Sequence, residues 1–89
     1  MNAIINPIVK ILWIDAETIG DNGWQELEDL KSSIESPPPI MQTVGFLIGE
    51  YSTHISVTDS IGDKECGHLT KIPLCMIRSM LYLEDIDNG

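Results

Sequence analysis

An almost continuous apolar stretch, "IVKILWIDA" at residues 8–16, comes near the start of the chain. Its β-branched and aromatic residues favour a β-strand. Both faces of that strand are apolar, with Val9, Ile11 and Trp13 on one face and Ile8, Leu12 and Ile14 on the other. This pattern predicts a strand that is buried on both sides or lines a tight barrel. The strand ends at the turn-forming run "ETIGDNG".

The period of the apolar residues becomes helical in "WQELEDLKSSI", residues 24–34. Trp24, Leu27, Lys31 and Ile34 fall at helical spacing with Leu30 beside them, and Glu26, Glu28 and Asp29 lie on the other side. The pattern predicts one short amphipathic helix, capped by Asp21 or Asn22 and ended by the prolines of "SPPPI". We expect Trp24 to anchor this helix in the core, and an exposed aromatic that binds a partner is the less favoured alternative.

A hairpin is predicted in "MQTVGFLIGEYSTHISVTDSI", residues 41–61. Its first strand covers 43–48, "GEYS" forms the turn, and its second strand covers 54–58. In the second strand Ile55 and Val57 would face the core, whereas His54, Ser56 and Thr58 would face solvent. Gly45 lies inside the first strand and indicates a bulge or a sharp bend there.

A polar loop, "DSIGDKECGHL", is followed by "LTKIPLCMIRSML" at residues 69–81, which fits two structures. Pro73 lacks an amide hydrogen, so the favoured reading is a strand at 70–72, one 3₁₀ turn in "PLCM" and a second strand in "IRSMLYL". The alternative is a continuous helix over 74–83, because Met76, Met80 and Leu83 are also helically spaced.

Together these elements predict a mainly β fold, a small SH3-like or Sm-like β-barrel of about five strands with one short α-helix inserted after the first strand. The 89 residues would form a single domain, 1–89, with an acidic, frayed tail at 84–89. The expected core residues are Trp13, Trp24, Val44, Phe46, Ile55, Val57, Ile72, Cys75 and Ile77.

Charge narrows the range of partners. Fourteen acids face five bases, which gives a net charge of −9. This balance disfavours nucleic acids and anionic membranes and favours a basic protein, although an acidic surface also keeps small proteins soluble. The first residues show no signal-peptide pattern, and no apolar run approaches the ~18 residues of a membrane helix. We therefore expect a cytoplasmic protein with free cysteines, Cys75 in the core and Cys66 in a loop.

Motifs for chemistry are absent from the sequence. His54, Cys66, His68 and Cys75 lack the paired spacing of a zinc site, so no metal is expected. No nucleophile elbow and no phosphate-binding loop occurs, and the neighbouring carboxylates resemble solvated faces. The sequence therefore predicts no cofactor and no enzymatic activity.

Five segments in a fixed order, "KILWIDA", "GWQELEDL", "PPPIMQTVGFLIGE", "HISVTDSI" and "TKIPLCMI", resemble a group of small uncharacterised proteins of tailed phages and prophages. The resemblance covers residues 8–83. It implies a phage accessory protein expressed in an infected bacterium, and it supplies no catalytic residue.

Three functions follow as hypotheses. The first is inhibition of a host defence or regulatory protein through an acidic surface, with Asp15, Glu17, Asp21, Glu26, Glu28 and Asp29 as binding candidates. The second is an oligomeric Sm-like ring that binds a nucleotide signal through Lys10, Lys71 or Arg78 at its subunit junctions. The third is a minor virion or assembly component.

Overall fold

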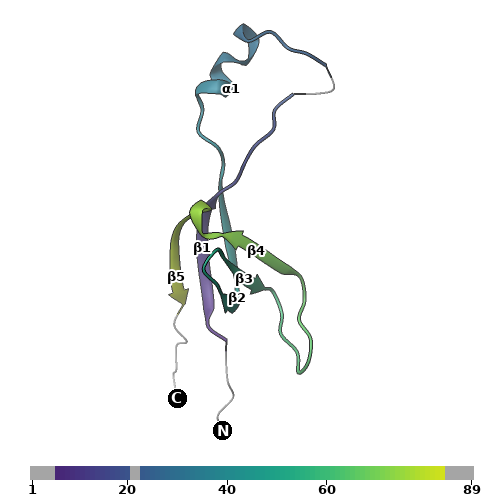
Figure 1. Ribbon diagram of the computed structural model, residues 1–89, viewed down its shortest axis with the longest axis vertical. Helices are drawn as coiled ribbons and strands as arrows, with labels where there is room; N and C mark the ends of the chain where they lie inside the picture. The colour runs from purple at the N-terminus through teal and green to yellow at the C-terminus, as the bar shows by residue number, and fades with distance from the viewer. Residues whose placement is uncertain (1–5, 21–22, 84–89) are drawn as a thin grey trace.

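The chain folds into a β-sheet from which one long connection stands out (Figure 1). The computed structural model describes residues 6–20 and 23–83. Their elements are β1 (Ile8–Ile14), the 3₁₀ helix η1 (Glu28–Leu30), α1 (Lys31–Glu35), β2 (Ile40–Glu50), β3 (His54–Thr58), β4 (Leu69–Pro73), the 3₁₀ helix η2 (Leu74–Met76) and β5 (Ile77–Leu83). We call the connection between β1 and β2, residues 15–20 and 23–39, the arm.

The five strands form one antiparallel sheet in the order β4-β3-β2-β1-β5. The predicted mainly β class, the five strands and the single short α-helix after the first strand are therefore confirmed. Within the described part of the chain β4 and β5 are the two edges of the sheet and do not pair with each other. The sheet is thus open, and closure into a barrel stays a prediction.

Strand β2 changes partner halfway along its length. Residues 40–46 pair with β1 and residues 46–50 pair with β3, with an irregular register between Leu47 and Gly49. Gly45 lies at this change, and a Cβ there would stand 2.7 Å from the carbonyl oxygen of Thr58. The glycine therefore allows two backbones to approach closely, as its position inside a strand indicated.

The two readings of residues 69–83 are resolved in favour of strand, turn and strand. Strand β4 ends at Pro73, η2 follows, and the amide of Leu74 donates to the carbonyl oxygen of Thr53 at 2.9 Å. Pairing of β5 with β1 then shifts register between Leu12 and Trp13. Because of this bulge, both Ile77 and Met80 pack against the core although they are three residues apart.

The core lies on one face of the sheet and is built from aliphatic residues. Its buried members are Val9, Ile11, Leu47, Ile55, Val57 and Ile72, and Trp13, Ile77 and Met80 pack against them partly buried. Of the predicted core residues, Ile55, Val57 and Ile72 are fully confirmed. Phe46 is half-buried but lies on the face opposite the core, in register with Ile8, so its core prediction is wrong. The core predictions for Trp24, Val44 and Cys75 are wrong, since all three are exposed.

Two further expectations about exposure fail for topological reasons. Ser56 and Thr58 are buried rather than solvent-facing, because β3 has a paired strand on each side and both side chains are small. The other face of strand β1 is only partly covered, since Ile8 is 37% exposed and Leu12 and Ile14 are half-buried. The apolar pattern of β1 therefore predicted a covering layer that the described chain does not provide.

Candidate functional site

The arm makes this protein strongly elongated. The described chain measures 62 × 27 × 25 Å, with a radius of gyration of 18.1 Å, whereas a compact domain of this length has about 12 Å. Figure 1 shows the arm continuing beyond the ends of β1 and β2, with α1 far from the strands. Most described residues of the arm are accordingly exposed.

A narrow neck joins the arm to the sheet. The amide of Asp15 donates to the carbonyl oxygen of Pro39 at 3.2 Å, directly after the last β1–β2 pair, Ile14 and Ile40. The returning chain contains the three consecutive prolines 37–39, whose fixed φ angles favour an extended path. The neck therefore directs the arm away from the sheet rather than back onto it.

The helical part of the arm is shorter than predicted. It begins at Glu28 in η1 and continues as the five-residue α1, instead of covering 24–34. The residues before these helices, Leu27 and Leu30, form no side-chain cap. The predicted caps Asp21 and Asn22 lie outside the described residues. A helix this short gains little from its own backbone hydrogen bonds.

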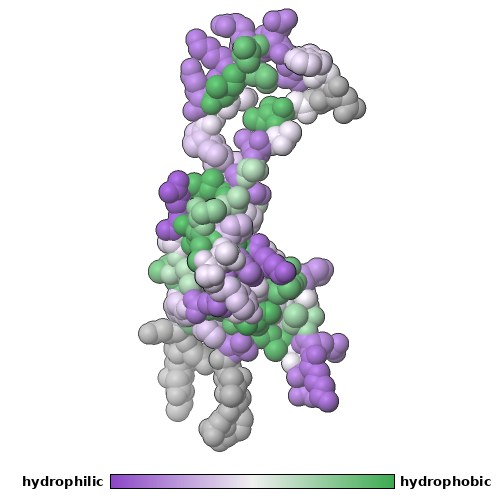
Figure 2. Space-filling view, viewed as in Figure 1, coloured by the Kyte–Doolittle hydropathy of each residue, from purple (hydrophilic) through white to green (hydrophobic). Residues whose placement is uncertain are grey.

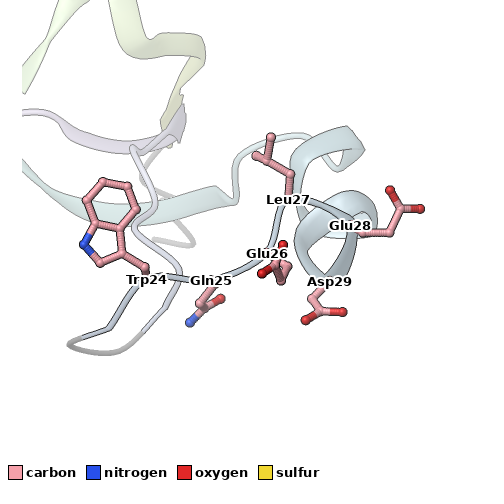
Figure 3. A pocket seen from close by; sticks show the side chains of 6 residues that line it. All are labelled: Trp24, Gln25, Glu26, Leu27, Glu28 and Asp29. Atoms are coloured by element: carbon pink, nitrogen blue, oxygen red, sulfur yellow. The ribbon is translucent and has the colours of Figure 1, made fainter.

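Apolar side chains of the arm are exposed. Trp24 is 103% exposed and Leu27 is 75% exposed, so the predicted docking of this segment into the core is wrong. Figure 3 shows Trp24 and Leu27 directed to one side of the segment, and Gln25 and Asp29 directed to the other. Residues 24–29 surround a shallow hollow on the arm itself. The physical reason for the error is that the arm extends away from the only core available to it.

The predicted acidic binding residues that the structure describes fall on the arm. Glu17, Glu26, Glu28 and Asp29 are exposed, and Asp15 is half-buried at the neck. Asp21 lies outside the described residues. Among the described residues, none of these carboxylates forms an ion pair, and the Asp15 Oδ1 accepts a hydrogen bond from the amide of Ala16 at 2.8 Å. The structure therefore places these acids on one projecting element, with their charge unneutralised.

The predicted cationic residues lie on three different strands. Lys10 is on β1, inside the sheet, whereas Lys71 is on the edge strand β4 and Arg78 on the edge strand β5. Arg78 lines a hollow of about 290 Å³ at the base of the arm, together with Ile14, Asp15, Ala16, Cys75 and Met76. One chain thus does not gather the three cations into a single site.

The described ranges, 6–20 and 23–83, also bear on metal-ligand groups, free thiols and membrane-spanning helices. They contain no group of three or more His, Cys, Asp or Glu residues that could hold a metal ion. Both Cys66 and Cys75 are exposed free thiols, so the loop position of Cys66 is confirmed. No helix in these ranges is long and apolar enough to cross a membrane.

Comparison with known proteins adds no relative. No protein-family model matches the sequence, and no curated protein or solved structure shows significant similarity to it. The assignment of the candidate site therefore depends on the geometry and charge of the arm alone. The sequence predicted the apolar side of this segment but not its exposure, because helical periodicity normally implies burial.

Proposed function

We propose that this protein is a non-catalytic accessory protein of a tailed phage that acts in the cytoplasm of the infected bacterium. It binds and inhibits a host defence or regulatory protein that presents a basic surface. The observation that carries this proposal is the projecting arm with its exposed acids, Glu17, Glu26, Glu28 and Asp29. The resemblance to small phage proteins supports the phage setting.

Electrostatics supports a basic partner. Residues 15–35 contain seven acids and one base, Lys31, and the whole chain carries −9. Charges held on a projecting element attract an oppositely charged surface over about 10 Å at moderate salt, which accelerates encounter. Inhibition follows when the arm occupies a basic groove that normally receives a polyanion such as nucleic acid.

The test is affinity capture from host lysate with the tagged protein, followed by identification of the bound proteins. We expect basic host proteins to be retained at about 0.05 M salt and released at about 0.5 M, because the Debye length shortens severalfold over this range. A retained partner should then lose its activity when the protein is added. Capture that is insensitive to salt would contradict recognition by charge.

A pair of matched variants separates the arm from general acidity. Glu26→Gln with Glu28→Gln removes two negative charges from the arm, and Asp63→Asn with Glu65→Gln removes two from the exposed loop between β3 and β4. We expect the arm variant to lose the partner and the loop variant to keep it. Equal losses would mean that net charge, rather than the arm, determines binding.

A second candidate function is favoured by the open edges of the sheet. We propose it as the alternative: copies of an incompletely closed SH3-like or Sm-like barrel join β4 of one copy to β5 of the next, which forms a ring. Lys71 and Arg78 lie on those two edge strands, so each junction would bring one of each together. Two cations at a junction suit the phosphates of a small nucleotide signal.

Native mass spectrometry tests the ring. We expect a mass of several chains that increases in steps when a cyclic dinucleotide is added as the probe. Lys71→Gln and Arg78→Gln should each abolish the step without dissociating the ring, because edge pairing uses backbone groups. A single-chain mass at all concentrations would rule out this alternative.

A further inference from the structure

The sheet has a second apolar face, opposite the core, which the described chain leaves uncovered. It consists of alternate positions of β1 from Ile8 to Ile14, of β2 from Ile40 to Phe46 and of β5 from Ser79 to Leu83. We call it the outer face. Ile8 lies in register between Phe46 and Leu83, and Lys10 lies between Val44 and Leu81 in the next row. Val44 is 57% exposed and Leu81 is 59% exposed.

Charge on the outer face is opposite to that of the arm. In a chain with fourteen acids and five bases, the alternate positions of these three strand segments hold no acid and one base, Lys10. The acids of residues 15–35 are instead on the arm. The apolar outer face and the apolar side of the arm thus carry charges of opposite sign.

The arm exposes apolar side chains of its own. Trp24 and Leu27 are directed to the same side of the segment (Figure 3). Ile34, further along the arm, is 61% exposed. Figure 2 shows hydrophobic surface on the arm that is separated from the sheet by the narrow neck. Because the neck and the prolines 37–39 direct the arm away from its own strands, its own outer face is out of reach.

We propose that a second copy of this chain covers the outer face, and that the apolar side of one arm docks across β2, β1 and β5 of its partner. A two-fold axis that crosses the long axis near the neck places each arm over the other copy's outer face, so the two contacts are identical. Leu27, Trp24 and Ile34 then supply the apolar contacts. Lys10 attracts the acids at the rim of the arm.

A dimer would cover apolar side chains that the described chain leaves exposed. Monomeric proteins rarely expose contiguous apolar patches above a few hundred Å², and stable interfaces bury about 1,200–2,000 Å² in total. In a two-fold dimer each of the two identical arm-on-face contacts supplies half of this buried area. The inference does not depend on the proposed function, since the side of the arm that bears Gln25 and Asp29 stays accessible in the dimer.

The first test uses the unmodified chain. Light scattering and Trp fluorescence are followed from about 1 to about 100 µM, the range in which weak dimers dissociate. We expect the mass to double, and the Trp24 emission to shift to shorter wavelength as its ring leaves water. Trp24→Phe is the spectral control, because Trp13 is the other tryptophan and is already partly buried. A single-chain mass throughout would overturn the inference.

The second test mixes two disabled variants. An arm variant, Trp24→Ser with Leu27→Ser, and a face variant, Val44→Glu with Leu81→Glu, should each weaken self-association at least tenfold. Mixed together they should form a heterodimer, because the intact arm of the face variant meets the intact face of the arm variant. Absence of a heterodimer would overturn the arm-on-face arrangement.

Controls keep the second test decisive. Circular dichroism checks that each variant folds, and Lys10→Glu replaces the face variant if the double substitution unfolds the sheet. Association that survives both the arm and the face variants would assign the contact to the edge strands β4 and β5 instead. That result would also overturn the arm-on-face dimer.

Discussion

The sheet and the arm use similar residues in opposite ways. In the sheet, Ile11, Ile55 and Ile72 lie on three different strands and are buried together in one core. In the arm, Leu27 and Ile34 recur with equal regularity and remain exposed. The difference teaches that an apolar pattern specifies an element, whereas its burial depends on a surface within reach.

Backbone hydrogen bonding shows the same contrast. Strands β1 and β2 pair over seven consecutive positions that are more than 25 residues apart. The arm is held by local bonds, such as those from the Asp29 amide to Glu26 and from the Leu30 amide to Leu27, both 3.1 Å long. Elements with few long-range contacts open at low free energy, so the arm should contribute little to the stability of the isolated chain.

The largest expected effect separates the two regions directly. Ile11→Ala removes a fully buried side chain from the middle of the sheet and should cost about 2–5 kcal/mol of unfolding free energy. Ile34→Ala removes the same atoms from the arm and should change it by less than about 0.5 kcal/mol. Denaturant unfolding of both variants measures the difference. Comparable losses would mean that the arm packs as the sheet does.

Gly45 provides the next largest effect. A Cβ added there would stand 2.7 Å from the Thr58 carbonyl oxygen, so Gly45→Ala must displace backbone and should cost about 1–3 kcal/mol. Gly62→Ala is the matched control, because the nearest atoms to its added Cβ are 3.5 Å away. Thermal unfolding should show a lower midpoint for the first variant alone. Similar midpoints would contradict the close approach of β2 and β3.

Trp13 and Trp24 extend the comparison to polar contacts. The Trp13 Nε1 donates to the Thr43 Oγ1 at 2.9 Å, whereas Trp24 is fully exposed. Thr43→Val leaves the partly buried indole without this acceptor and should cost about 1 kcal/mol. Thr18→Val, at an exposed position of the arm, is the control. Equal unfolding free energies in the two variants would show that the Trp13 bond contributes nothing.

The sequence predicted the sheet better than the arm, and for a physical reason. Strand signals in "IVKILWI" and "HISVT" were correct because both segments pair with neighbours that the chain itself supplies. Pro73 indicated the interruption between β4 and β5 correctly, since a residue without an amide hydrogen interrupts a ladder. The bulge in β5 was not predictable, because register depends on the partner strand.

For the candidate site, the charged residues were predictable from the sequence and the exposed apolar residues were not. The clustering of acids in residues 15–35 was readable from the sequence, and the structure places the described ones on the arm. Exposure of Trp24 was not predictable, since periodicity alone does not say whether a covering surface exists. Val44 was misassigned for a related reason. It faces away from the core, because β2 carries apolar residues on both of its faces.

The smallest expected effect concerns the exposed loop between β3 and β4. It tests whether a surface contact next to the sheet contributes measurably to stability, unlike the exposed side chains of the arm. The His68 Nδ1 lies 3.2 Å from the Asp59 Oδ2, and this hydrogen bond lowers the pKa of the Asp59 carboxyl below its ordinary value of 3.8. A lowered pKa means that the folded state favours the carboxylate. The resulting stabilisation is therefore present above pH 3.8 and is lost as the pH falls through the lowered pKa.

In His68→Ala the pKa of Asp59 should rise toward its ordinary value, as measured by a carbon-13 NMR titration of the carboxyl group. The stability difference between the two proteins should be small, because both side chains are largely exposed, and it should shrink on acidification. An unchanged pKa in the variant would show that the pair is not formed in solution, and the loop would then resemble the arm rather than the sheet.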